Sequence, residues 1–185
     1  MQLRSKNLYF NALSSKDYPL FCSVFSDESV MRYAYHDATD NAAELREKFD
    51  KILSETGLPA ASRPIYMYMV SEARSGAFIG IADIVIEFWQ SERCGEIGYF
   101  LLPEFWGKGY ASEIACTLVD TFFARMGLHR ICATCNAENK GSERVMQKAG
   151  MTLEGVLRKA RYKQGVWHDE LRYSILRCEW HKNKA

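Results

Sequence analysis

The sequence has no long hydrophobic run and no excess of charge of either sign. No apolar stretch reaches the ~20 residues of a membrane-spanning helix, and no basic start followed by an apolar core marks a secretory signal. Lysine and arginine number 24 against 23 aspartate and glutamate, which gives a net charge of +1. This balance argues against a broad basic face for nucleic acid, although it leaves room for a local charged pocket. We expect a cytoplasmic protein that neither enters a membrane nor binds nucleic acid directly.

The sequence also lacks cysteine and histidine residues at the spacing of a complete metal site. Of the six cysteines, Cys132 and Cys135 form a C-x-x-C, which would suit a redox or zinc site. They lie in an apolar run typical of a strand, where alternation sends the two side chains to opposite faces. No second C-x-x-C or histidine pair completes a zinc site. We therefore expect reduced thiols and no metal.

The rest of the composition is that of an ordinary globular protein. Hydrophobic residues make up 48% and charged residues 25% of the 185 positions, and no repeat, low-complexity tract or linker interrupts them. The length suits one folding unit. We expect a single domain over residues 1–185.

Hydrophobic periodicity and turn residues predict strands alternating with helices. Strands are expected at residues 3–13, 65–70, 78–89, 96–102, 129–135, 151–162 and 167–180. Helices are expected after the caps Ser14 and Asn41, around residues 30–31, and at residues 109–126 and 139–149. This order indicates an α/β (α+β) fold, with a mixed, mostly antiparallel sheet of about seven strands flanked by helices.

The most informative segment is the turn PEFWGKGYA at residues 103–111, which joins a strand to the longest helix. The first backbone N–H groups of a helix lack partners, and the helix dipole is positive there. Without Cβ atoms, Gly107 and Gly109 let a ligand approach the backbone. The turn is therefore either an anion site suited to a diphosphate or a tight strand-to-helix connection. It is neither G-x-x-x-x-G-K-[ST] nor G-x-G-x-x-G, because Ser112 takes the third glycine position.

These residues resemble a known family. Gly109-Tyr110-Ala111 resembles the end of the Q/R-x-x-G-x-G/A motif of GNAT acetyltransferases, with Trp106 at the Gln/Arg position. Residues 96–111 and 139–151 are similar to the RimJ/RimL branch, the ribosomal-protein N-terminal acetyltransferases and their relatives. The resemblance covers residues 96–180 well and residues 1–90 only in layout. It implies a single GNAT domain that moves the acetyl group of acetyl-CoA directly to a primary amine in a ternary complex.

The resemblance also implies how the cosubstrate is held. The pantetheine amides would pair with the strand backbone at residues 100–102, and the pyrophosphate would lie on the glycine turn. The expected cofactor-binding residues are Phe100, Leu101, Leu102, Gly107, Lys108, Gly109, Tyr110, Ala111, Ser112, Asn139 and Ser142. Asn139 is equally well explained as a helix cap, and Lys108 either reaches a phosphate or faces solvent.

Two residues are catalytic candidates. Glu96 matches the strand position of the catalytic glutamate in related histone acetyltransferases and would act as general base, since the amine must lose a proton before it attacks. The alternative is that Glu96 only holds a neighbouring strand or loop. Ser142 would donate a proton to the departing thiolate, as a serine of the family does, or it faces the backbone in the first turn of its helix.

Two positions depart from the family. Met146 stands where many relatives have a tyrosine and cannot donate a proton, and Arg161 stands near a second acidic residue of the ribosomal-protein enzymes. These departures leave a second reading, a catalytically weak or inactive module that senses acetyl-CoA. The amine acceptor stays open among a peptide N-terminus, a polyamine and another small amine, and the protein is expected to be a monomer or a homodimer.

Overall fold

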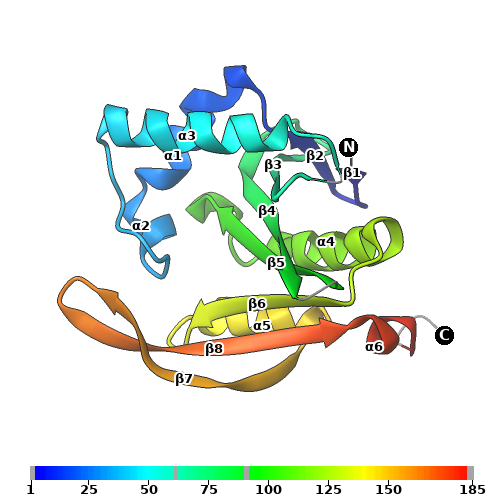
Figure 1. The fold of residues 1–185 in the computed structure, drawn as a ribbon. Helices are drawn as coiled ribbons and strands as arrows, with labels where there is room; N and C mark the ends of the chain where they lie inside the picture. The colour runs from blue at the N-terminus through cyan, green and yellow to red at the C-terminus, as the bar shows by residue number, and fades with distance from the viewer. Residues whose placement is uncertain (1–2, 61, 90–91, 183–185) are drawn as a thin grey trace.

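The computed structural model describes residues 3–60, 62–89 and 92–182, in which eight strands form one sheet with helices on both faces (Figure 1). The strands are β1 (Leu3–Arg4), β2 (Leu8–Ala12), β3 (Ile65–Glu72), β4 (Phe78–Trp89), β5 (Glu92–Leu101), β6 (Arg130–Asn136), β7 (Thr152–Lys163) and β8 (Val166–Leu176). The helices are α1 (Tyr18–Phe25), α2 (Glu28–Met31), α3 (Ala42–Thr56), α4 (Tyr110–Met126), α5 (Lys140–Lys148) and α6 (Arg177–Lys182), and 3₁₀ turns lie at Ser15–Asp17 and Pro103–Phe105.

The predicted α/β fold is confirmed, with two corrections to its elements. Residues 3–13 were expected as one strand, but the Ser5 N–H donates to the Leu8 carbonyl and folds them into the β1–β2 hairpin. The sheet therefore has eight strands rather than about seven. The last expected strand ends at Leu176 and continues as α6, because the Glu179 carboxylate accepts the Leu176 N–H at the helix start.

Two hydrophobic clusters cover the two faces of the sheet. One contains the buried stripe of α4, including Ile114, Leu118 and Phe122, together with residues of α5. The other packs α1 and α3 on the opposite face through Phe21 and Phe49. No helix in the described part of the chain is long and apolar enough to cross a membrane.

The sheet is incomplete at its centre. Its strand order is β1-β2-β3-β4-β5-β6-β8-β7, and most neighbours are antiparallel over their lengths. The parallel pair β5–β6 is different, because it joins only Cys94–Glu96 to Arg130–Cys132. Beyond Glu96, β5 follows β4 as far as Leu101 while β6 follows β8, so an opening lies between the two halves of the sheet.

Candidate active site

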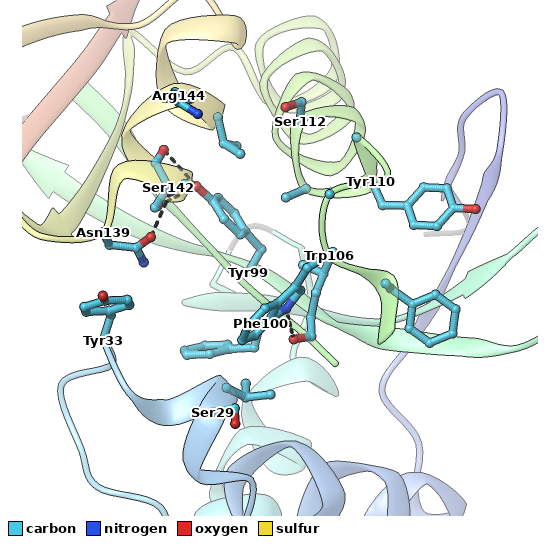
Figure 2. Close-up of a pocket in the computed structure, with 18 of the residues that line it drawn as sticks. Ser29, Tyr33, Tyr99, Phe100, Trp106, Tyr110, Ser112, Asn139, Ser142 and Arg144 are labelled. Atoms are coloured by element: carbon cyan, nitrogen blue, oxygen red, sulfur yellow. Dashed lines mark hydrogen bonds between the residues drawn. The ribbon is translucent and has the colours of Figure 1, made fainter. Parts of the chain in front are cut away.

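A cleft of about 450 Å³ lies where β5, the start of α4 and α5 converge (Figure 2). All but two of the residues expected to bind a cosubstrate line it: Phe100, Leu101, Gly107, Gly109, Tyr110, Ala111, Ser112, Asn139 and Ser142. These residues come from the end of β5, from the turn that leads into α4, and from the start of α5, which lies further along the chain. The expected grouping around the glycine turn is therefore present in space.

Leu102 and Lys108 are the two that do not line this cleft. The Leu102 N–H donates to the Ile79 carbonyl at 2.9 Å, and its side chain packs against the α1–α3 cluster. The Lys108 ammonium lies 5.2 Å from the centre of the Phe105 ring. Leu102 is thus turned toward β4, and strand alternation turns the peptide groups of Leu101 toward the opening instead.

The glycine turn has the geometry of an anion site. Gly107 and Gly109 have φ values of 73° and 85°, in the left-handed region that glycine adopts readily. A Cβ at either position would meet nothing within 4 Å, so glycine is required there by conformation and not by space. Gly109 caps α4 without any side-chain hydrogen bond, which leaves the first-turn N–H groups of this described helix facing the cleft. Such a turn fits a diphosphate.

The α5 helix forms the opposite wall. Its cap is Asn139, whose side-chain oxygen accepts the Ser142 N–H at 3.0 Å, so the helix-cap reading of Asn139 holds while the residue also lines the cleft. Arg144 and Lys148 line the same wall and were not identified from the sequence. The spacing of Gly141, Arg144 and Lys148 places them on one helical face, and this pattern would have found them. Their charges suit the phosphates of a ligand on the glycine turn.

Tyr99 is another cleft residue that sequence reasoning missed. Its hydroxyl lies 2.7 Å from Ser142 Oγ, as the dashed line in Figure 2 shows. Burial raises the pKa of Tyr99, and the hydrogen bond to Ser142 acts in the opposite direction. The phenol therefore keeps its proton at neutral pH. Met146, where many relatives have a tyrosine, is fully buried in the core below α5.

The two cysteines of the C-x-x-C, Cys132 and Cys135, lie in different surroundings. Both are free thiols, and burial raises the pKa of Cys132 and of Cys135 to about 11. Cys135 packs into the α4 side of the core, while Cys132 accepts a hydrogen bond from Arg172. Across residues 3–60, 62–89 and 92–182, no group of three His, Cys, Asp or Glu side chains could hold a metal ion.

A second cleft of about 440 Å³ adjoins the first. The two share the residues Val30, Tyr33, Tyr99, Phe100, Asn139 and Ser142. The second cleft runs along β4 and β5 and contains three carboxylates, Asp83, Glu87 and Glu96. Glu96, the expected base, therefore lies in the second cleft, which meets the first at Tyr99 and Ser142.

Asp83 has an unusual environment in this second cleft. Burial raises the pKa of Asp83 to about 7, the Glu96 charge acts in the same direction, and Lys48 opposes both. Gly98 makes room for it, because a Cβ on Gly98 would lie 2.8 Å from Asp83 Oδ1. Asp83 and Glu96 are therefore electrostatically linked carboxyl groups, one of which exchanges its proton near neutral pH.

Comparisons with known proteins agree with this geometry. Residues 7–152 match the family model described as an acetyltransferase (GNAT) domain. The uncharacterized N-acetyltransferase YnaD of Bacillus subtilis is 33% identical over 190 residues, covering 97% of this chain and 99% of that protein. The spermidine N(1)-acetyltransferase of Vibrio cholerae is 24% identical, covering 95% and 96%.

Solved structures give the same result. An acetyltransferase (GNAT family) from Bacillus anthracis superposes with a TM-score of 0.79 at 30% identity, covering 96% of this chain and 99% of that one. The Vibrio cholerae spermidine N-acetyltransferase in complex with CoA and spermine has a TM-score of 0.82 at 22% identity, with 96% and 99% covered. At that identity the second likeness bears on the fold alone.

Proposed function

The chain belongs to the GNAT family of N-acetyltransferases, enzymes that use acetyl-CoA, and from this membership we propose how its two clefts divide the reaction. Acetyl-CoA binds in the first cleft and a primary amine in the second. The acetyl group passes directly between them where the clefts share Tyr99 and Ser142. The observation that carries this proposal is the joining of a diphosphate-type cleft to an acidic cleft at a pair of hydroxyl groups.

The cosubstrate is held by the chain's own amides and cations. The first-turn N–H groups of α4, exposed by Gly107 and Gly109, bind the pyrophosphate, and Arg144 and Lys148 supply positive charge. The N–H of Leu101 lies at the opening of the sheet and pairs with the pantetheine arm, while the Leu101 carbonyl accepts the indole N–H of Trp106 at 2.7 Å. When bound, acetyl-CoA supplies an activated acetyl group whose leaving group is a thiolate.

The second cleft removes the proton from the amine. Glu96 acts as general base, as expected from the sequence, and Asp83 acts with it because the two carboxyl groups are linked. A base is most effective when its pKa is near the working pH, and burial brings the pKa of Asp83 to about 7. The amine proton passes to one of this pair, directly or through water.

Ser142 donates the proton that the leaving thiolate needs. Either hydroxyl can donate in the hydrogen bond between Tyr99 and Ser142 Oγ, and when Tyr99 donates, the Ser142 O–H is free to turn toward the cleft. Met146, which cannot donate a proton, is buried and takes no part in this step.

The charge of the second cleft favours an acceptor that carries a further positive charge. Asp83, Glu96 and Glu87 are spread along paired strands, with Glu87 at the exposed outer end. Arg161, which lines this cleft, is already neutralised by an ion pair with Glu170. A diamine, polyamine or cationic peptide N-terminus would place its second charge along this row.

We assign both clefts, and therefore the whole reaction, to a single domain over residues 1–185. Residues of this chain line both clefts, and the proposal is made for a monomer and for a homodimer alike. The cysteines are free thiols, which supports the expected cytoplasmic setting.

Thiol release from acetyl-CoA tests the proposal. The acceptors are 1,4-diaminobutane and spermidine, butylamine as the singly charged control, and a lysine-rich peptide with a free or a blocked N-terminus. We expect release with a doubly charged amine, acetylated product by mass spectrometry, and weaker activity with butylamine. Tight CoA binding by calorimetry with no release for any acceptor would instead establish the sensor reading.

A further inference from the structure

The last residue of α2 and the turns that follow it form a wall of both clefts. We call these residues, 31–37, the strap. Tyr33 lines both clefts, Tyr35 lines the second and Arg32 the first. In Figure 1 the strap lies beside the tip of the β7–β8 hairpin, more than a hundred residues later in the chain.

Contacts with other parts of the chain hold the strap in place more than its own hydrogen bonds do. The structure describes all of its residues, and within it one main-chain hydrogen bond forms, from the Ala34 N–H to the Met31 carbonyl at 3.0 Å. A segment with so little internal bonding takes its shape from its neighbours. Here the neighbours are two buried cations of β7.

Lys163 is the first of these cations. Its ammonium donates to three strap carbonyls, those of Met31 at 2.7 Å, His36 at 2.9 Å and Ala34 at 3.2 Å. Three acceptors match the three protons of an ammonium group. The side chain is 7% exposed, and the Asp37 carboxylate lies 3.5 Å from it. Lys163 therefore gathers the carbonyls at the end of α2 and in the turns after it around one point of positive charge.

Arg161 is the second cation. Its Nη1 donates to the Tyr33 carbonyl, and its guanidinium lies 3.8 Å from the centre of the Tyr35 ring. Its Nε donates to Glu170 at 2.6 Å, so the group is fixed on the hairpin side as well. The Tyr35 hydroxyl donates to the other oxygen of Glu170 at 3.3 Å and closes the cluster.

We propose that Arg161 and Lys163 are positioning residues for the acceptor: they hold the strap in the shape that forms one wall of the second cleft. This inference rests on the proposed function, which makes that cleft the amine site. The first cleft depends less on the strap, because β5, α4 and α5 form its other walls. Loosening the strap should therefore weaken use of the amine more than binding of CoA.

The test compares Lys163→Met with Lys159→Met. Lys159 is on the same strand, its side chain is 68% exposed, and its contacts are to Asp169 and Trp167 rather than to the strap. The first readout is trypsin cleavage after Arg32, mapped by mass spectrometry, and it needs no activity. We expect cleavage there to be about tenfold faster or more in Lys163→Met and unchanged in Lys159→Met, because opening of a held segment controls its proteolysis.

The second readout is kinetic. We expect Lys163→Met to raise the KM for the amine roughly tenfold, while the Kd for CoA changes less than about twofold, as loss of charge-assisted bonds on one side of a site predicts. Arg161→Lys keeps the charge but loses the paired geometry, and it should fall between Lys163→Met and the wild type. Equal protection of Arg32 in Lys163→Met and wild type, or an equal loss of amine and CoA affinity, would overturn the inference.

Two further outcomes separate this inference from the proposed function. A wild type that releases no thiol defeats the proposed function, and the proteolysis comparison then still decides whether Lys163 holds the strap. If Lys163→Met does not fold, Arg161→Lys carries the same two readouts against the same control. If Arg161→Lys changes neither the rate of cleavage after Arg32 nor the KM for the amine, the inference is also overturned.

Discussion

Tyr99 on β5 and Ser142 at the start of α5 meet through their hydroxyl groups, 2.7 Å apart, where the two clefts join. The Ser142 N–H is bound to Asn139, so the serine is fixed at both its backbone and its side chain. This pair gives the first of five predictions about the site.

Ser142→Ala and Tyr99→Phe should each lower kcat, Ser142→Ala by about 10²-fold or more, as loss of a general acid does. The double variant should lose little more than Ser142→Ala, because Tyr99 acts through Ser142. Tyr173→Phe is the matched control, since its hydroxyl bonds to Glu143 and Gln147 and lies outside both clefts as described. Thiol release measures all four, and strictly additive losses would refute the coupling.

Glu96→Gln should lower kcat by about 10²-fold or more while the Kd for CoA stays the same, because a general base acts on the amine and not on the cosubstrate. Glu104→Gln is the control, an exposed carboxylate close in sequence that lines neither cleft. Full activity in Glu96→Gln would return Glu96 to a structural role and leave Asp83 as the base.

The rate of acetyl transfer should rise as the pH of the solution increases through about 7. Burial, and then the Glu96 charge, raise the pKa of Asp83 to about 7, so below that pH the carboxyl holds a proton and cannot accept another. In Asp83→Asn this rise should disappear from the plot of kcat/KM against pH. A profile identical to wild type would exclude Asp83 from proton transfer.

Asp83 should also affect stability, in a direction that the sign of its shift fixes. Its folded pKa is above the ordinary value of 3.8, so between about 4 and 7 the folded state binds more protons than the unfolded state. The contribution of Asp83 to stability is therefore lost as pH rises through that window. Urea unfolding should show Asp83→Asn gaining stability over wild type at pH 8 relative to pH 4, and the reverse trend would contradict the assignment.

Gly109→Ala should lower the affinity for CoA far more than Gly76→Ala does, although the two substitutions should lower folding stability by similar amounts. A non-glycine residue in the left-handed region costs ~1–2 kcal/mol, and any shift of the turn also misplaces the N–H groups that face the cleft. Gly76→Ala is a matched control, because Gly76 has a φ of 75°, open space around it and a place in the β3–β4 turn. Calorimetry with CoA should separate two variants of similar stability, and equal affinities would remove the turn from the binding site.

The features predicted correctly from the sequence are those fixed by neighbours in the chain. The glycine turn, the Asn139 cap and the start of α3 at Asn41 all depend on contacts within a few residues, and each lies where it was predicted. The last strand was wrong past Leu176 because one side chain, Glu179, starts a helix within an otherwise strand-like run.

The features that were missed join distant parts of the chain. Tyr99 and Ser142 are 43 residues apart, and Lys163 is 132 residues from Met31. Asp83 lies in the first half of the chain, where residues match the family only in layout, and its proton affinity comes from burial that no local pattern shows. The pairing of strands, together with the packing of α2 and α5 beside the sheet, brings these groups together.

The three residue pairs between β5 and β6 make a short seam down the middle of the molecule. An extended substrate laid against the free edge of β5 would therefore take the place of a missing strand between two halves of the sheet that pair with each other along that seam. Under the proposed function, the cosubstrate would complete the sheet while it reacts, and its departure after transfer would leave the edge of β5 open again.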